Sequence, residues 1–266
     1  MPDAGGERVL MQAGMVQTDQ MRAAVDALCE VLGDGLRALY LHGSAVSGQL
    51  RPQSDIDLLA IIDQSLRDDQ RRDLLAALLR ISGRYPPAPG GSRCLELMLF
   101  RLADLSDNAA RAEFTFGEWL RDGFEAGHTP RPTQDPEHIL ILAQARHQAV
   151  ALCGPPASAL LPDIPPRQVR QALRDALPAL LGGLQQDTRN VLLTLARMWR
   201  TASSGDFVSK DAAAQWVMPQ LPQHHAVTLD HARMGYLGRI TDDWDGRQDD
   251  AQSLAGELAA HVTRLL

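Results

Sequence analysis

Residues Leu36–Ile62, which read LRALYLHGSAVSGQLRPQSDIDLLAII, carry the clearest indication of the fold. The stretch begins with an apolar run, continues through a Gly-Ser pair and a loop containing Gly and Pro, and ends in a second apolar run. Apolar runs of this length, bounded by Gly and Pro, are typical of buried strands. We therefore expect strands at Leu36–His42 and Ile56–Ile62, with a loop between them.

Two aspartates, Asp55 and Asp57, open the second run. Side chains alternate faces along a strand, so both carboxylates should point the same way. Two neighbouring carboxylates repel each other, and a divalent cation between them would turn that repulsion into binding. Gly43 and Ser44 add a tight turn whose N–H groups and hydroxyl can hold phosphate oxygens. An isolated Asp-x-Asp after Ser54 could simply cap a turn, but with the Gly-Ser pair it indicates metal-dependent nucleotide chemistry. The chain has no Walker-type P-loop, which disfavours β,γ-cleaving ATPase chemistry.

A third carboxylate, Glu96, lies in an expected strand at Cys94–Phe100. Alternation places it on a face that is otherwise apolar, where an unpaired charge is costly. One interpretation is an edge strand with Glu96 facing water. The other places Glu96 beside Asp55 and Asp57, as a metal ligand, as the base that takes a proton from an attacking hydroxyl, or as both.

The composition is that of an ordinary globular protein: 266 residues, 45% hydrophobic and 22% charged. The net charge of −7 disfavours nucleic acid as the main partner and suits a cationic small molecule. No segment is apolar enough to cross a bilayer, and the N-terminus lacks the features of a secretion signal. The three cysteines, Cys29, Cys94 and Cys153, show no metal-ligand spacing, and we expect buried thiols in a reducing compartment. We therefore expect a cytoplasmic monomer without a membrane partner.

The order of predicted elements indicates an α+β fold, with a small mixed-sheet domain followed by an all-helical C-terminal domain. We expect a flexible segment at residues 1–17, the sheet domain at 18–132 and the helical domain at 133–266. After about Asp135 only helices are predicted, the first capped by Asp135 itself. The expected helices are one carrying Met21 to Leu32 and others at Arg67–Ser82, from Asp135, and at Arg167–Leu181, Asp187–Ala202, Lys210–Met218, Val227–Leu237 and Gln252–Leu266.

The Gly-Ser and Asp-x-Asp pattern resembles the signature of the polymerase-β-type nucleotidyltransferases. From about residue 18 onward, successive blocks resemble the aminoglycoside 3″- and 9-adenylyltransferases, which inactivate streptomycin and spectinomycin by transferring AMP from ATP to a drug hydroxyl. The blocks are LHGSAVSGQLRPQSDIDLLAI, FGEWLRDGFEAG, QARHQAVALCGP, DTRNVLLTLARMW, SKDAAAQWVMPQLP and ARMGYLG.

This resemblance implies roles for particular residues. It makes Asp55, Asp57 and Glu96 the ligands of Mg²⁺, with two ions expected, and Glu96 the catalytic base. It implies that five residues contact ATP, the co-substrate: Ser44, Ser54, Asp135, Lys210 and Tyr236. Three of these also have ordinary interpretations, namely a helix cap for Asp135, an exposed lysine for Lys210 and a core tyrosine for Tyr236.

On the drug side, the resemblance implies that Trp119 stacks on the substrate and that Asp187 faces the drug's cationic groups. A single Trp between Phe116 and Leu120 would otherwise be interpreted as core. Streptomycin-using members of the family carry another Asp shortly before Asp187, where this chain has Gly182 and Gly183. We therefore expect spectinomycin to be the better substrate.

Two other functions fit parts of the sequence. One is a nucleotidyltransferase acting on a protein or nucleic-acid hydroxyl, which the acidic balance and the helical blocks disfavour. The other is a non-catalytic nucleotide-binding regulator, which would be expected to lack at least one of the three carboxylates.

Overall fold

The computed structural model describes residues 19–46, 54–86, 88, 90–105 and 110–266. The expected flexible segment at residues 1–17 lies outside these ranges. The chain divides into two compact units. The first contains the residues up to Gln134 together with Ala145–Pro162, and the second contains Asp135–Gln144 together with Asp163–Leu266. Among the described residues, no helix combines the length and apolar character needed to span a bilayer.

The first unit is built on a six-stranded mixed sheet in the order β5-β4-β3-β2-β1-β6. Only β2 and β3 run parallel, and the other neighbouring pairs are antiparallel. The predicted strands at β1 and β2 are confirmed with the same bounds, and β3 is shifted by one residue. The strands are β1 (Leu36–His42), β2 (Ile56–Ile62), β3 (Leu95–Arg101), β4 (Arg111–Phe116), β5 (Thr133–Gln134) and β6 (Val150–Cys153).

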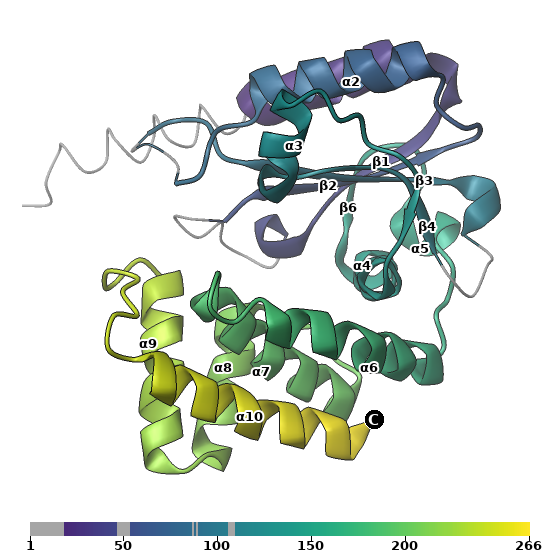
Figure 1. Ribbon diagram of the computed structural model, residues 1–266. Helices are drawn as coiled ribbons and strands as arrows, with labels where there is room; N and C mark the ends of the chain where they lie inside the picture. The colour runs from purple at the N-terminus through teal and green to yellow at the C-terminus, as the bar shows by residue number, and fades with distance from the viewer. Residues whose placement is uncertain (1–18, 47–53, 87, 89, 106–109) are drawn as a thin grey trace, which may run out of the picture. The chain divides into compact units, whose positions relative to one another are not determined.

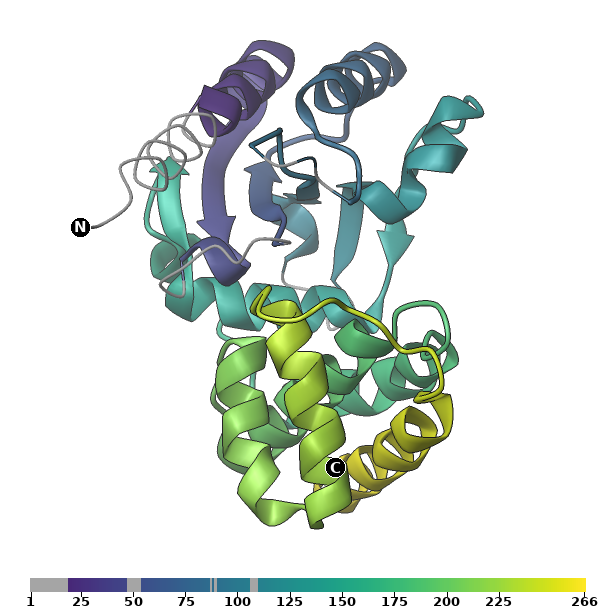
Figure 2. The ribbon, with the colours of Figure 1, turned by 90° about the vertical axis from the view of Figure 1, so that its left-hand side faces the viewer.

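One face of this sheet is covered by α2 (Asp68–Ile81) and by the helix formed by residues 19–32, which lie side by side in Figures 1 and 2. Leu28 and Leu74 of these helices pack on alternate residues of the central strands, among them Leu58 and Leu97. The opposite face carries the other set of alternating side chains. The remaining short helices of the unit are η1 (Gly33–Gly35), η2 (Gly43–Ala45), η3 (Leu102–Asp104), η4 (Glu118–Leu120), α3 (Arg121–Glu125) and α5 (Ala157–Leu160).

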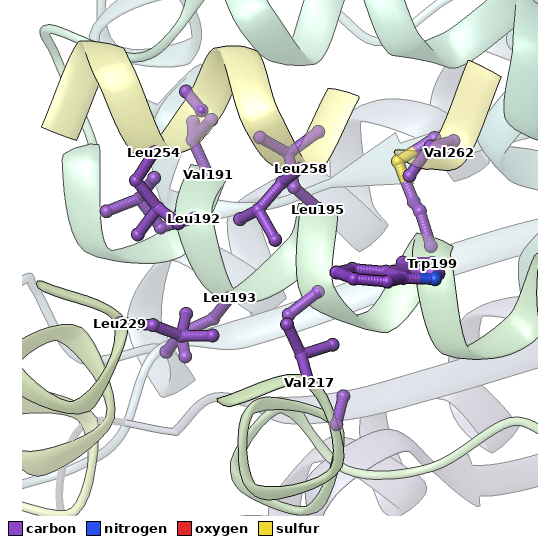
Figure 3. Packing of buried hydrophobic residues seen from close by; sticks show 14 of the residues in the cluster. Val191, Leu192, Leu193, Leu195, Trp199, Val217, Leu229, Leu254, Leu258 and Val262 are labelled. Carbon is purple, nitrogen blue, oxygen red and sulfur yellow. The ribbon is translucent and has the colours of Figure 1, made fainter. Parts of the chain in front are cut away.

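The second unit is helical and is organised around α7 (Thr188–Ser204), which contributes the largest share of its core. Figure 3 shows Leu192 and Leu195 of α7 packed against Leu254 and Leu258 of the last helix. A left-handed Gly205 ends α7. The other helices are α4 (Pro136–Gln148), whose last turn belongs to the first unit, α6 (Pro166–Gly182), α8 (Lys210–Val217), η5 (Met218–Gln220), α9 (Gln223–Tyr236) and α10 (Gln248–Leu265).

Two predictions are corrected by the structure. The expectation of helices only after Asp135 is wrong for Val150–Cys153, which forms β6 and pairs with β1 at the edge of the sheet. Residues 145–162 accordingly belong to the first unit. The expectation of three buried thiols holds for Cys94, but Cys153 is half-buried and Cys29 is exposed. All three thiols are free.

Candidate active site

The two strand carboxylates lie side by side on the central strands. Asp57 of β2 is paired in register with Glu96 of β3. Their neighbours Ile56, Leu58 and Leu95 pack into the core beneath α2, so both carboxylates are on the opposite face of the sheet. Because β3 lies between β2 and β4, the interpretation of Glu96 as an edge-strand residue is wrong. The prediction that Glu96 lies beside Asp57 is confirmed, and its proximity to Asp55 stays a prediction.

The Gly-Ser turn is fitted to Asp57. Gly43 has a left-handed backbone with φ of 64°, and a Cβ atom placed on it would lie 2.0 Å from Oδ2 of Asp57. The conformation and the close approach both require glycine here. Ser44 follows directly as the second residue of η2 (Gly43–Ala45). The structure therefore brings together the two motifs that the sequence separates by about ten residues.

Asp55 and Ser54 lie where the chain enters β2, and Arg93 holds this entry. An Nη1 donor of Arg93 binds the carbonyl oxygen of Ser54 at 2.7 Å. Burial lowers the pKa of Arg93, and the negative charge of the nearby Asp55 opposes that shift. The Ser54 hydroxyl is buried and has no hydrogen-bond partner within the described ranges. A buried hydroxyl without a partner at this position is consistent with its predicted contact to a phosphate oxygen.

His42 completes a row of three polar side chains across the sheet. It is the last residue of β1 and is paired in register with Asp57, so the row runs His42, Asp57, Glu96 over three adjacent strands. His42 is buried, and burial lowers its pKa to about 4. The imidazole is therefore neutral at neutral pH. A hydrogen bond with the backbone of Leu58 acts in the opposite direction, toward a higher pKa.

The two carboxylates of this row, those of Asp57 and Glu96, fit Mg²⁺, which prefers oxygen ligands. Within the described part of the chain, no three or more His, Cys, Asp or Glu side chains are already arranged to hold a metal ion. Mg²⁺ bound with a nucleotide does not need such an arrangement, since one or two carboxylates and the phosphates supply its ligands. The role of Asp55, Asp57 and Glu96 as metal ligands remains a prediction.

Trp119 lies on the surface of the first unit. It is in η4 and is 59% exposed, so the interpretation of Trp119 as a core residue is wrong. Its ring lies against the backbone of Gly117, where a Cβ atom would be 2.1 Å from the ring. The turn is anchored by Glu118, which pairs with the buried Arg121 at 2.6 Å. An indole ring that is exposed and fixed in position by its neighbours can stack on a ligand.

In the helical unit, Asp135 and Lys210 belong to one charged cluster. Oδ1 of Asp135 accepts a hydrogen bond from the Glu137 N–H at 2.8 Å, which confirms its role as the cap of α4. Lys210 begins α8, is half-buried, and its Nζ donates to Oδ1 of Asn190 on α7. The interpretation of Lys210 as a fully exposed lysine is therefore wrong.

Asp187 and Tyr236 are both close to the start of α7. Asp187 is the exposed N-cap of that helix, and its side chain accepts a hydrogen bond from the Asn190 N–H at 3.4 Å. Tyr236 is half-buried at the end of α9 and packs against the helical core. The preceding residue, Gly235, approaches the side chain of Arg189 in the first turn of α7. Lys210 and Asp187 therefore both contact Asn190 in the first turn of α7, and Tyr236 follows the glycine that approaches Arg189. Asp135 lies at the start of α4.

Comparison with known proteins identifies the family. Residues 32–86 match the polymerase beta nucleotidyltransferase domain, and residues 159–261 match the aminoglycoside adenylyltransferase C-terminal domain. A spectinomycin 9-adenylyltransferase of Staphylococcus aureus is 40% identical over 227 residues, which cover 85% of this chain and 87% of the relative. The chain belongs to the aminoglycoside adenylyltransferase family.

Two further relatives support this assignment to the aminoglycoside adenylyltransferases. An aminoglycoside (3'') (9) adenylyltransferase of Escherichia coli is 34% identical over 257 residues, covering 93% of this chain and 95% of the relative. The solved structure of the spectinomycin adenyltransferase AAD(9) from Enterococcus faecialis, with ATP and spectinomycin, matches with a TM-score of 0.88 and 27% identity. That match covers 93% of this chain and 99% of the other.

The structure of this aminoglycoside adenylyltransferase also adds residues that the sequence did not single out. Burial and the neighbouring Asp135 raise the pKa of Glu137, whereas Arg197 and Lys210 lower it. The residue as a whole keeps exposed surface. Arg197 is seven residues after Asn190 and shares its face of α7. The seven-residue spacing from Asn190 in the DTRN block is the one signal in the sequence that could have indicated Arg197.

Proposed function

We propose that this protein transfers AMP from ATP to a hydroxyl group of spectinomycin and releases pyrophosphate, with Mg²⁺ as the metal. The observation that carries this proposal is the pairing of Asp57 with Glu96, with Gly43 fitted against Asp57, in a chain of this family. The relatives named for spectinomycin support the choice of drug.

In the proposed reaction, an oxygen of the drug attacks the α-phosphorus of ATP while the bond from that phosphorus to the bridging oxygen of pyrophosphate breaks. Glu96 takes the proton that leaves the attacking hydroxyl. Asp55, Asp57 and Glu96 would hold Mg²⁺, which when bound stabilises charge on the phosphoryl oxygens. Ser44 and Ser54 bind phosphate oxygens.

The helical unit supplies the remaining groups in this proposal. The positive charge of Lys210 stabilises the departing pyrophosphate. Asp135 and Tyr236 contact the nucleotide. Trp119 of the first unit offers a ring face to the drug, and Asp187 pairs with one of its amines.

The choice between drugs can be tested directly. We expect kcat/KM for spectinomycin to exceed that for streptomycin by about 10- to 100-fold, because one charge-assisted hydrogen bond to a guanidinium group is worth about 1.5–3 kcal/mol. The acid that would make it is missing between Gly182, where α6 ends, and Asp187. Pyrophosphate release with ATP and each drug, and with no acceptor, measures the preference. Streptomycin used as well as spectinomycin would contradict the proposed specificity, and no release with either drug would contradict the proposed function.

A further inference from the structure

His42 presents a buried ring nitrogen that nothing in the described structure satisfies. The residue is 7% exposed, and its Nε2 atom has no hydrogen-bond partner among the described residues. Buried polar atoms without partners are costly and rare, so each one calls for an explanation. His42 is paired in register with Asp57 and directly precedes Gly43, which touches the Asp57 carboxylate.

Two other unsatisfied atoms belong to the same region. They are the Ser54 hydroxyl at the entry to β2 and the Thr115 hydroxyl of β4. Thr115 is paired in register with Met98, which is on the same face of β3 as Glu96. Three of the five unsatisfied side-chain atoms in the described chain thus belong to residues on, or next to, the strands that flank or carry Asp57 and Glu96. This grouping indicates polar atoms that are satisfied by a ligand.

The hydrogen-bonding role of Nε2 follows from the partner of the other ring nitrogen. The hydrogen bond between His42 and the Leu58 backbone acts to raise the pKa of the ring. A hydrogen bond has this effect when a ring N–H donates to a carbonyl oxygen, so His42 is the donor. The partnered nitrogen is Nδ1, because Nε2 is the one without a partner. In a neutral imidazole the second nitrogen is an acceptor. Nε2 therefore requires a donor from the ligand.

We propose that His42 is a positioning residue of the metal–nucleotide site, and that its Nε2 accepts a hydrogen bond from a water molecule bound to Mg²⁺. The inference rests on the proposed function, because it places the metal at the neighbouring Asp57. Mg²⁺ keeps several water ligands when it binds to proteins, and those waters are strong donors. Mutation of a residue that hydrogen-bonds to a ligand of a metal ion typically lowers the affinity for that ion by about 10- to 100-fold.

Two variants of His42 test the roles of the two ring nitrogens separately. His42→Asn keeps a short amide that can reach Leu58 but has nothing at the position of Nε2. His42→Gln extends an amide oxygen toward that position and can restore the acceptor. The measurement is calorimetric binding of ATP at a series of Mg²⁺ concentrations and in EDTA, with the melting temperature recorded for each variant.

We expect His42→Asn to raise the Mg²⁺ concentration for half-maximal ATP binding by about 10- to 100-fold, and His42→Gln to recover most of that loss. ATP binding in EDTA should not change. Unchanged Mg²⁺ dependence in a folded His42→Asn would overturn the inference, as would equal loss of ATP binding with Mg²⁺ and in EDTA. If His42→Asn does not fold, wild-type Mg²⁺ dependence of His42→Gln supports the inference, and its loss overturns it.

Two controls complete the series. His225 is equally buried and also has an unsatisfied ring nitrogen, but it is among the helices of the second unit, so His225→Asn should leave Mg²⁺ dependence unchanged. Asp57→Asn tests the proposed function itself and should abolish Mg²⁺-dependent ATP binding. If Asp57→Asn has its expected effect and His42→Asn has none, the inference about His42 fails and the proposed function stands.

Discussion

Replacing Gly43 with alanine should separate backbone strain from damage to the site. A left-handed conformation costs a residue with a Cβ atom about 1–2 kcal/mol. For a chain of this size, each kcal/mol lowers the melting temperature by about 2–4 °C, so we expect a loss of about 2–8 °C. The added Cβ would also lie 2.0 Å from Oδ2 of Asp57, whereas ordinary contact begins at 3.4 Å. The carboxylate must therefore retreat by more than an ångström.

A displacement of about 1 Å in a catalytic group can lower the rate by about 10²-fold. We expect Gly43→Ala to lose Mg²⁺-dependent ATP binding and to transfer AMP at least about 10²-fold more slowly. The matched control is Gly205→Ala, since Gly205 has φ of 79° and open space around an added Cβ. It should show the same drop in melting temperature with normal activity. Activity of Gly43→Ala equal to that of Gly205→Ala would show that the fit of Gly43 against Asp57 is not needed for catalysis.

Three other predictions test the base, the core and the pH dependence. Glu96→Gln should lower the turnover number at saturating ATP and Mg²⁺ by at least about 10²-fold, the usual contribution of a general base. Arg71→Ala should lower the free energy of unfolding in urea by about 3–5 kcal/mol, because it leaves Glu113 buried with its main partner removed. Burial and the neighbouring His224 lower the pKa of His225. Below the ordinary histidine pKa of about 6.5, this side chain therefore binds fewer protons in the folded protein than in the unfolded chain. Stability should therefore fall as the pH drops below that value, and His225→Gln should weaken this dependence.

Each of these has a control or a contradicting result. Turnover of Glu96→Gln within a few-fold of the wild type would show that Glu96 is not the base. For Arg71, the comparison is Arg67→Ala, which breaks an exposed ion pair with Asp69 on the same helix and should change stability by less than about 1 kcal/mol. An acid-unfolding curve of His225→Gln that coincides with the wild type would show that this histidine does not contribute.

The parts of the fold that follow from local pattern were predictable. The apolar runs of β1 and β2 and the Gly-Ser and Asp-x-Asp motifs were sufficient to place the carboxylates on one face. The strands β4 and β6 were missed because long-range contacts form them. In β4 the charged Glu113 interrupts the apolar pattern and is stabilised by Arg71 of α2. The four-residue β6 depends on pairing with β1, more than a hundred residues earlier.

The residues of the candidate site likewise divide into those that the local sequence pattern could select and those whose place depends on long-range contacts. Residue type and spacing were enough to select Asp55, Asp57 and Glu96. The position of His42 in the same row depends on strand register, which the sequence does not state. The exposure of Trp119 likewise depends on how η4 packs on the backbone of Gly117.

Transfer of AMP to spectinomycin can be tested by following both ends of the triphosphate in one reaction. The protein is incubated with Mg²⁺, spectinomycin and ATP carrying a label on either the α- or the γ-phosphorus. We expect the α-label to appear on spectinomycin and the γ-label in pyrophosphate, in equal amounts. Transfer of the γ-label to the drug, or release of pyrophosphate at the same rate without any drug present, would contradict the proposed transfer of AMP.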